Sequence, residues 1–171
     1  IAFLEYVRMK EGGKALLILP ASLIGNWQKE IDKFAPEMPC QILHKSDLKG
    51  SGGMRIQENR FLYITTYGMA LRLEELRNRK WDYLILDEAQ AIKNPGTKQT
   101  KAIKQIPAGM RIALTGTPIE NRLSDLWSLF DFLDQGLLGT SKEFTDFTKK
   151  LTDQVVGYAK LRKMIQPFLL R

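Results

Sequence analysis

Two acidic residues, Asp87 and Glu88, come directly after an apolar run at residues 83–86. A continuous apolar run is typical of a strand buried on both faces of a parallel sheet, and the carboxyl ends of such strands open into the crevice where ligands bind. In that crevice Asp87 can hold magnesium through water, and Glu88 can orient or deprotonate an attacking water. The acid pair is therefore a candidate site for hydrolysis of a nucleoside triphosphate, an interpretation that depends on a second motif further along the chain.

A polar turn at residues 115–118 follows another apolar strand pattern. Thr115 and Thr117 in this turn carry hydroxyls that can touch Gln90 or Glu88 across adjacent strand ends. Each motif also has an ordinary interpretation, because acids often follow strands as solvated charges and the turn can simply introduce the next helix. Together, the two motifs favour a single crevice that contains both strand ends.

Strand and helix patterns alternate along the chain, which predicts an α/β fold with a mostly parallel sheet flanked by helices. Helical periodicity indicates a first helix that ends at Gly12, and further helices at 22–34, 67–77, 97–106 and 121–133, with Ser22 expected to cap the second. Strands are predicted at 15–19, 40–43, 61–65, 82–87 and 111–114. The chain from residue 141 on is expected to be helical and more polar.

The glycine-rich segments do not have the order of a phosphate-binding loop. Such a loop follows a strand, opens a helix and ends in Lys followed by Ser or Thr. Gly12-Gly13-Lys14 instead closes a helix and is followed by Ala15, while the glycines at 50–53 have no such lysine behind them. We therefore predict that Gly12 and Gly13 terminate a helix.

Composition narrows the classes of protein. The chain has 171 residues, of which 44% are hydrophobic and 26% charged, as expected for one compact domain. Lys and Arg outnumber Asp and Glu by 26 to 19, and this excess favours a polyanionic partner.

A single cysteine, Cys40, and a single histidine, His44, exclude an internal disulfide or zinc site and fit a cytoplasmic location. No apolar run approaches the roughly 20 residues that span a bilayer, so a membrane role is disfavoured.

Five groups of residues carry a resemblance to a known family. They lie at 17–23 with 26–30, at 64–67, at 87–94, at 114–121 with 126–129, and at 166–171. In order and spacing they resemble the Swi/Snf family of DNA-dependent ATPases in helicase superfamily two, and the Ala89-Gln90 spelling is similar to that of bacterial members. The resemblance implies a RecA-like lobe of the P-loop NTPase type, one of two that clamp ATP while double-stranded DNA lies across both.

The resemblance also implies a role for each matched residue. Asp87 would serve magnesium, Glu88 would be the catalytic base, and Gln90 would sense the γ-phosphate of ATP. Thr115 and Thr117 would couple hydrolysis to movement of the lobes.

DNA contacts are implied for a further set of residues. Those expected along one phosphodiester strand are Pro20, Ser22, Asn26, Thr65 and Thr66. Positive charge nearby could come from Lys93, Lys98, Arg111 and Arg122, although each of these taken singly is more typical of a solvated surface residue. Contacts of this type hold a duplex in register without reading its bases. Trp27 and Trp127 lie on apolar stripes and are expected to be packing residues.

The family's phosphate loop and its second RecA-like lobe are expected upstream of Ile1 and downstream of Arg171. Residues 1–140 would then be a truncated first lobe and 141–171 its helical extension. We expect a fragment of an ATP-dependent translocase that remodels DNA–protein complexes, such as one containing RNA polymerase, and a fragment that lacks ATPase activity by itself. The alternatives are an RNA helicase or restriction-enzyme motor lobe of the same superfamily, and a non-catalytic nucleic-acid-binding module on the same fold.

Overall fold

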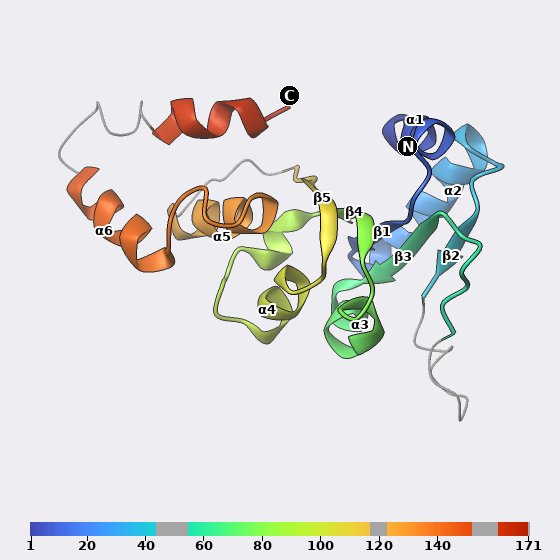
Figure 1. Cartoon of the computed structure of the whole chain (residues 1–171), viewed down its shortest axis with the longest axis horizontal. Coiled ribbons are helices and arrows are strands. Elements are labelled where there is room, and N and C mark those ends of the chain that lie inside the picture. Colours follow the sequence, from blue (N-terminus) through green and yellow to red (C-terminus); the bar gives the residue numbers. More distant parts are fainter. Residues whose placement is uncertain (44–54, 117–122, 152–160, 171) are drawn as a thin grey trace.

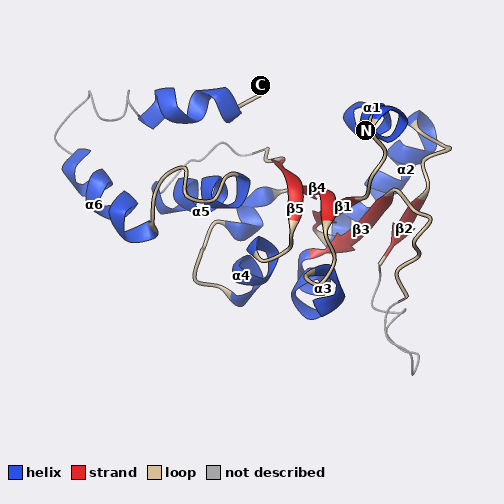
Figure 2. Ribbon diagram, viewed as in Figure 1, coloured by secondary structure: helices blue, strands red, loops and turns tan. Residues whose placement is uncertain are grey.

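The computed structural model, in which residues 1–43, 55–116, 123–151 and 161–170 are described, is built around one five-stranded sheet (Figures 1 and 2). Its strands are β1 (Ala15–Leu19), β2 (Cys40–Ile42), β3 (Leu62–Thr66), β4 (Trp81–Leu86) and β5 (Ala108–Ala113). The strand order is β2-β3-β1-β4-β5, and every neighbouring pair is parallel. The predicted α/β fold with a parallel sheet is therefore confirmed.

Helices cover both faces of this sheet (Figure 1). They are α1 (Ala2–Lys10), α2 (Ile24–Phe34), α3 (Tyr67–Arg72), α4 (Lys98–Lys104) and α5 (Leu123–Leu133), while α6 (Ser141–Leu151) packs on α5 instead. One face of β1, with Leu17, packs against α1 and α2, while the other face, with Leu16 and Ile18, belongs to the core shared with α3, α4 and α5. Burial on both faces explains why the central strands are apolar at almost every position.

Two helical predictions were wrong in their details. Ser22 does not cap α2, because a 3₁₀ turn at Ala21–Leu23 comes first and α2 begins at Ile24 without a side-chain cap. The helix predicted at 67–77 is divided, because Leu73 leaves the helical conformation (φ −86°, ψ 97°) and its side chain is buried in the core. A separate 3₁₀ turn follows at Glu74–Leu76.

Strand β5 begins three residues before the predicted segment 111–114. Glycine at position 109 favours the early start, because a Cβ atom there would make a tight contact, 3.2 Å from the carbonyl oxygen of Asp82 in β4. Glycine therefore lets the two strand backbones approach each other. Leu114 lies just beyond the strand, although its amide still donates to the carbonyl of Leu86 at 2.7 Å.

Gly12 and Gly13 end α1, as predicted. Both have positive φ values, 69° and 93°, which glycine adopts without steric cost. A Cβ atom at position 13 would lie 2.6 Å from the carboxylate of Asp82, which accepts a hydrogen bond from the Lys14 amide. These glycines therefore terminate a helix and lead into β1, which is the opposite order to that of a phosphate loop.

The C-terminal segment is helical, as predicted, over α6 and residues 161–165. Phe144 of α6 and Leu161 pack with Leu126 and Phe130 of α5 in a cluster separate from the two faces of the sheet. The division of the chain at residue 140 stays a prediction. Within the described ranges, no helix is both long and apolar enough to cross a membrane.

Candidate active site

The predicted site residues follow strands that end at one edge of the sheet. Leu19 of β1 is in register with Thr66 of β3, and Leu86 of β4 is in register with Ala113 of β5. Because all strands run the same way, the residues that follow them gather at the carboxyl edge, where ligands bind in open α/β sheets.

A chain of hydrogen bonds joins the ends of β4 and β5. The Gln90 side-chain amide donates to the Glu88 carboxylate at 2.6 Å, and the Thr115 hydroxyl donates to the Gln90 side-chain oxygen at 3.2 Å. The Ala89 amide also donates to the carbonyl of Leu114 at 2.9 Å. The prediction that the two strand ends meet is therefore confirmed for Thr115, whereas Thr117 lies outside the described residues.

Asp87 is half-buried, and each of its carboxylate oxygens accepts one hydrogen bond. The Trp27 indole N–H donates to Oδ2 at 2.6 Å, and the Glu88 amide donates to Oδ1 at 2.9 Å. Trp27 packs against the apolar core, as expected, but it also holds this acid. Sequence reasoning missed that second role because the two residues are 60 positions apart.

Tyr67 is a second residue of the site that sequence reasoning missed. Its buried hydroxyl donates to the main-chain carbonyls of Asp87 at 2.8 Å and Glu88 at 3.4 Å. Burial first, and then the negative charges of Asp87 and Glu88, raise the pKa of Tyr67 well above its ordinary value. The phenol therefore stays protonated, and remains a hydrogen-bond donor, at any working pH.

Glu88 is in the left-handed region (φ 51°, ψ 54°), the one non-glycine residue with positive φ among those the structure describes. A side chain in this conformation costs about 1–2 kcal/mol. The conformation reverses the chain after β4, and the Glu88 carbonyl then accepts from the Ala91 amide at 3.0 Å. Strain of this kind is concentrated at functional sites, where surrounding contacts maintain it.

The residues expected to contact DNA differ in exposure. Ser22, Asn26 and Lys93 are exposed, and Pro20 is half-buried. Thr66, also half-buried, caps α3 by accepting the Met69 amide at 3.2 Å. Thr65 is fully buried and its hydroxyl donates to the Leu43 carbonyl at 3.2 Å, so its side chain faces the interior. Of the residues expected to add charge, Lys98 is exposed and Arg122 lies outside the described residues.

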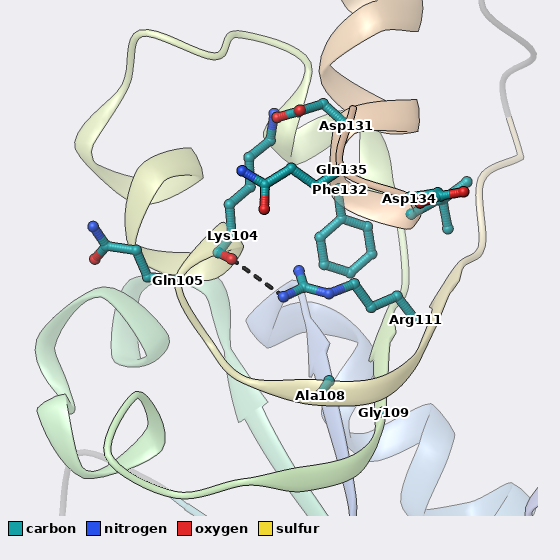
Figure 3. A pocket seen from close by; sticks show the side chains of 10 residues that line it. Lys104, Gln105, Ala108, Gly109, Arg111, Asp131, Phe132, Asp134 and Gln135 are labelled. Carbon is teal, nitrogen blue, oxygen red and sulfur yellow. Dashed lines mark hydrogen bonds and ion pairs between the residues drawn. The ribbon is translucent and has the colours of Figure 1, made fainter. Parts of the chain in front are cut away.

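A cavity of about 510 Å³ lies elsewhere, between α4, α5 and the start of β5 (Figure 3). Three of its charged groups are already engaged: Lys104 pairs with Asp131 at 2.8 Å, and Arg111 donates to the carbonyls of Lys104 and Ile106. Arg111 also stacks over Phe132, 5.0 Å from the ring centre. None of the predicted catalytic residues lines this cavity, so it is not the candidate site, whereas Arg111, which was expected to add charge near DNA, does line it.

Asp87 fits the part of a magnesium ligand. Each of its oxygens accepts one hydrogen bond and so keeps a lone pair, and magnesium commonly takes one or two carboxylates, with water and phosphate oxygens as the other ligands. In the described part of the chain, no three or more His, Cys, Asp or Glu side chains gather into a metal site.

The family model of the SNF2-related domain matches residues 1–171. This chain belongs to the SNF2-related family. Among curated relatives, the DNA excision repair protein ERCC-6-like of Danio rerio is 45% identical over 91% of the chain. The TATA-binding protein-associated factor mot1 of Aspergillus fumigatus is 36% identical over 92% of it.

The solved SWI2/SNF2 ATPase core of Sulfolobus solfataricus in complex with dsDNA matches 99% of this SNF2-related chain, with a TM-score of 0.90 and 38% identity. The expected RecA-like fold is thereby confirmed. The chain spans 12% and 9% of the two curated relatives and 36% of that solved chain. These 171 residues thus correspond to only one part of the related proteins.

Proposed function

We propose that these residues form the nucleotide-hydrolysing lobe of an ATP-dependent motor that moves along double-stranded DNA in the cytoplasm and remodels DNA–protein complexes. One observation carries the proposal: the hydrogen-bonded series from Asp87 through Glu88 and Gln90 to Thr115 at the carboxyl edge of a parallel sheet. The names of relatives, which include an excision repair protein and a TATA-binding protein-associated factor, support the link to DNA.

The chemistry assigned to the chain's own groups follows from their contacts. Asp87 would hold magnesium through water, and that ion supplies countercharge for the phosphates of ATP. Gln90 holds one carboxylate oxygen of Glu88, and the other oxygen would take a proton from the attacking water. Gln90 would sense the γ-phosphate, and Thr115 with Thr117 would couple its hydrolysis to movement of the two lobes.

DNA would lie across the ends of β1 and β3, which are adjacent in the sheet. The exposed groups there, Ser22 and Asn26 with Pro20 and Thr66 beside them, are proposed to contact phosphates, and Lys93 to add charge. Because the Thr65 hydroxyl is buried, its proposed contribution is to hold the strand end rather than to touch DNA. The net charge of +7 supports a polyanionic partner.

The proposal includes partners that these residues do not contain. Stabilising a transferred phosphoryl group requires cationic donors around it, and the described residues offer no phosphate loop for that purpose. We therefore propose that a phosphate loop and a second RecA-like lobe complete the site, and that residues 1–171 alone do not hydrolyse ATP. The target would be a DNA-bound complex, of which RNA polymerase is one example.

The test is ATP hydrolysis by the full-length protein with duplex DNA, single-stranded DNA, RNA or no nucleic acid. Duplex should stimulate the rate most. Glu88→Gln should lower the stimulated rate by about 100-fold or more, because a positioned general base contributes roughly 10²–10⁴-fold. Glu75→Gln, an equal change at an exposed acid in the turn after α3, should leave the rate unchanged.

Each contrary result points to a different error. Stimulation mainly by RNA or single strands would favour a helicase or another motor over a duplex translocase. Full activity in Glu88→Gln would remove the assigned base, and absence of hydrolysis under every condition would favour a binding module. Turnover by residues 1–171 alone would refute the proposed need for the other lobe.

A further inference from the structure

We infer that Trp27 and Tyr67 are positioning residues that connect contact with DNA to the geometry of the acid pair Asp87-Glu88. The inference rests on the proposed function. Each residue donates a hydrogen bond to the acid pair, Trp27 to the Asp87 carboxylate and Tyr67 to the main chain. Each is also the immediate chain neighbour of a residue proposed to contact DNA: Trp27 follows Asn26, and Tyr67 follows Thr66.

Trp27 connects α2 to the carboxylate of Asp87. Asn26 is exposed on this helix, while Trp27 is half-buried and packs in the same core as Ile31. An indole ring has only two side-chain torsions, so once it is packed its N–H moves with the helix. A shift of α2 would therefore be felt at the Asp87 carboxylate, 2.6 Å from the indole nitrogen.

Tyr67 connects α3 to the main chain of the acid pair. It is the first residue of α3, and the cap formed by the Thr66 side chain ties the two residues into one unit. Its hydroxyl donates to the main-chain carbonyls of both Asp87 and Glu88. These bonds support the left-handed conformation of Glu88, which sets the direction of its carboxylate.

The two bonds converge on one dipeptide from opposite faces of the sheet, because Trp27 packs in the core of one face and Tyr67 in the core of the other. β1 and β3, which lead into α2 and α3, are neighbours, and β4 pairs with β1 on its other side. Trp27 fixes the acid that serves magnesium, and Tyr67 fixes the peptide that carries the base. DNA that shifts either segment can therefore change the alignment of the pair without any change in the sheet.

The experiment compares four single variants and one double variant, Trp27→Phe with Tyr67→Phe, of the full-length protein. Trp27→Phe and Tyr67→Phe each remove one donor and keep a ring. Their matched controls are Trp127→Phe, which loses a bond to the Gly139 carbonyl, and Tyr83→Phe, which loses a bond to the Glu11 carboxylate. Circular dichroism establishes that each variant is folded, and should Trp27→Phe fail to fold, Tyr67→Phe decides, because it removes a single hydroxyl.

Duplex-stimulated kcat should fall about tenfold to 100-fold in Trp27→Phe, which loses a bond to a charged carboxylate, and about twofold to tenfold in Tyr67→Phe, which loses a bond to neutral carbonyls. The affinity for duplex DNA should stay within about twofold, because neither group is proposed to touch it. The magnesium concentration for half-maximal rate should rise in Trp27→Phe alone. The two changes together should cost less than the product of their single effects, because both act on one dipeptide.

Several results would overturn the inference. Stimulated rates in Trp27→Phe and Tyr67→Phe equal to those of the two controls would remove it and leave the proposed function intact. A loss of DNA affinity parallel to the loss of kcat would make the two residues part of the DNA site instead. A wild-type protein that duplex DNA does not stimulate would overturn both this inference and the proposed function.

Discussion

Replacing Glu88 with glycine should give a more stable protein than replacing it with alanine. Both variants lose the carboxylate and its bond to Gln90, so that loss cancels in the comparison. They differ in the Cβ atom, which alanine must hold in the left-handed conformation at φ 51°. The comparison therefore isolates the backbone strain at the proposed base.

The size of the difference follows from two opposing terms. Relief of the left-handed conformation is worth about 1–2 kcal/mol. Glycine also loses about 0.5–1 kcal/mol more backbone entropy on folding than alanine does. The balance favours glycine by up to about 1.5 kcal/mol, which for a folding unit of this size raises the melting temperature by up to about 6 °C.

The assay is differential scanning calorimetry of the full-length protein carrying Glu88→Gly or Glu88→Ala. Lys93, at the end of the same turn, provides the control because its conformation is right-handed (φ −59°, ψ −32°). There the order should reverse, with Lys93→Gly less stable than Lys93→Ala. If glycine is the less stable choice at both positions, Glu88 is not held in the left-handed region and the strain argument is wrong.

Two further predictions concern parts of the molecule away from the acids. Ser128→Ala should lower the free energy of unfolding by about 1–3 kcal/mol, because the buried hydroxyl donates to the Ile92 carbonyl and the variant leaves that carbonyl unpaired. Chemical denaturation measures the loss, and Ser124→Ala, at an exposed position of the same helix, should change the denaturation midpoint little. Hydrogen bonds from Arg79, which has the larger effect, and from Lys14 lower the pKa of Glu58 from 4.5 to about 2. The small contribution of Glu58 to stability is therefore complete above pH 4.5 and is lost as the pH falls toward 2. An NMR titration of Glu58 with a midpoint near 4.5 would contradict this.

The sequence predicted the sheet well because burial leaves a strong pattern in parallel strands. Residues 15–19 and 83–86 are apolar throughout, and both lie in central strands that are buried on both faces. Because all the strands run in the same direction, Asp87 and Thr115, which follow β4 and β5, must both lie at the carboxyl edge of the sheet. The hydrogen bonds through Gln90 follow from that placement.

Details that depend on tertiary contacts could not be predicted in this way. Leu73 looks like one more helical residue in the sequence, but burial of its side chain in the core ends α3 before it. In a strand, successive side chains alternate between faces, yet two consecutive threonines do not reveal which of them faces inward. The structure shows that Thr65 faces inward, where its hydroxyl donates a hydrogen bond to the Leu43 carbonyl.

Trp27 shows why long-range polar contacts escape sequence reasoning. Its place on the apolar stripe of α2 is fully explained by packing, so nothing in the local pattern asks for another partner. The bond to Asp87 arises only because β1 and β4 are neighbours, which brings residues 60 positions apart to the same edge. A tryptophan that packs through its ring still has one N–H donor, and a buried donor needs an acceptor.

The acid pair is therefore held from several elements at once, and this has a thermodynamic consequence. Trp27 and Tyr67 reach it from α2 and α3, while Thr115 reaches it through Gln90 from the end of β5. If DNA at the first two elements changes the affinity for nucleotide at the acids, nucleotide must change the affinity for DNA by the same factor.

That reciprocity applies to binding and not to kcat, so a motor can have a strongly stimulated rate while the two ligands affect each other's affinity only modestly. Hydrogen bonds that align the acids without forming part of either binding surface are suited to that kind of coupling, because they act on the reacting geometry and leave both sets of contacts unchanged.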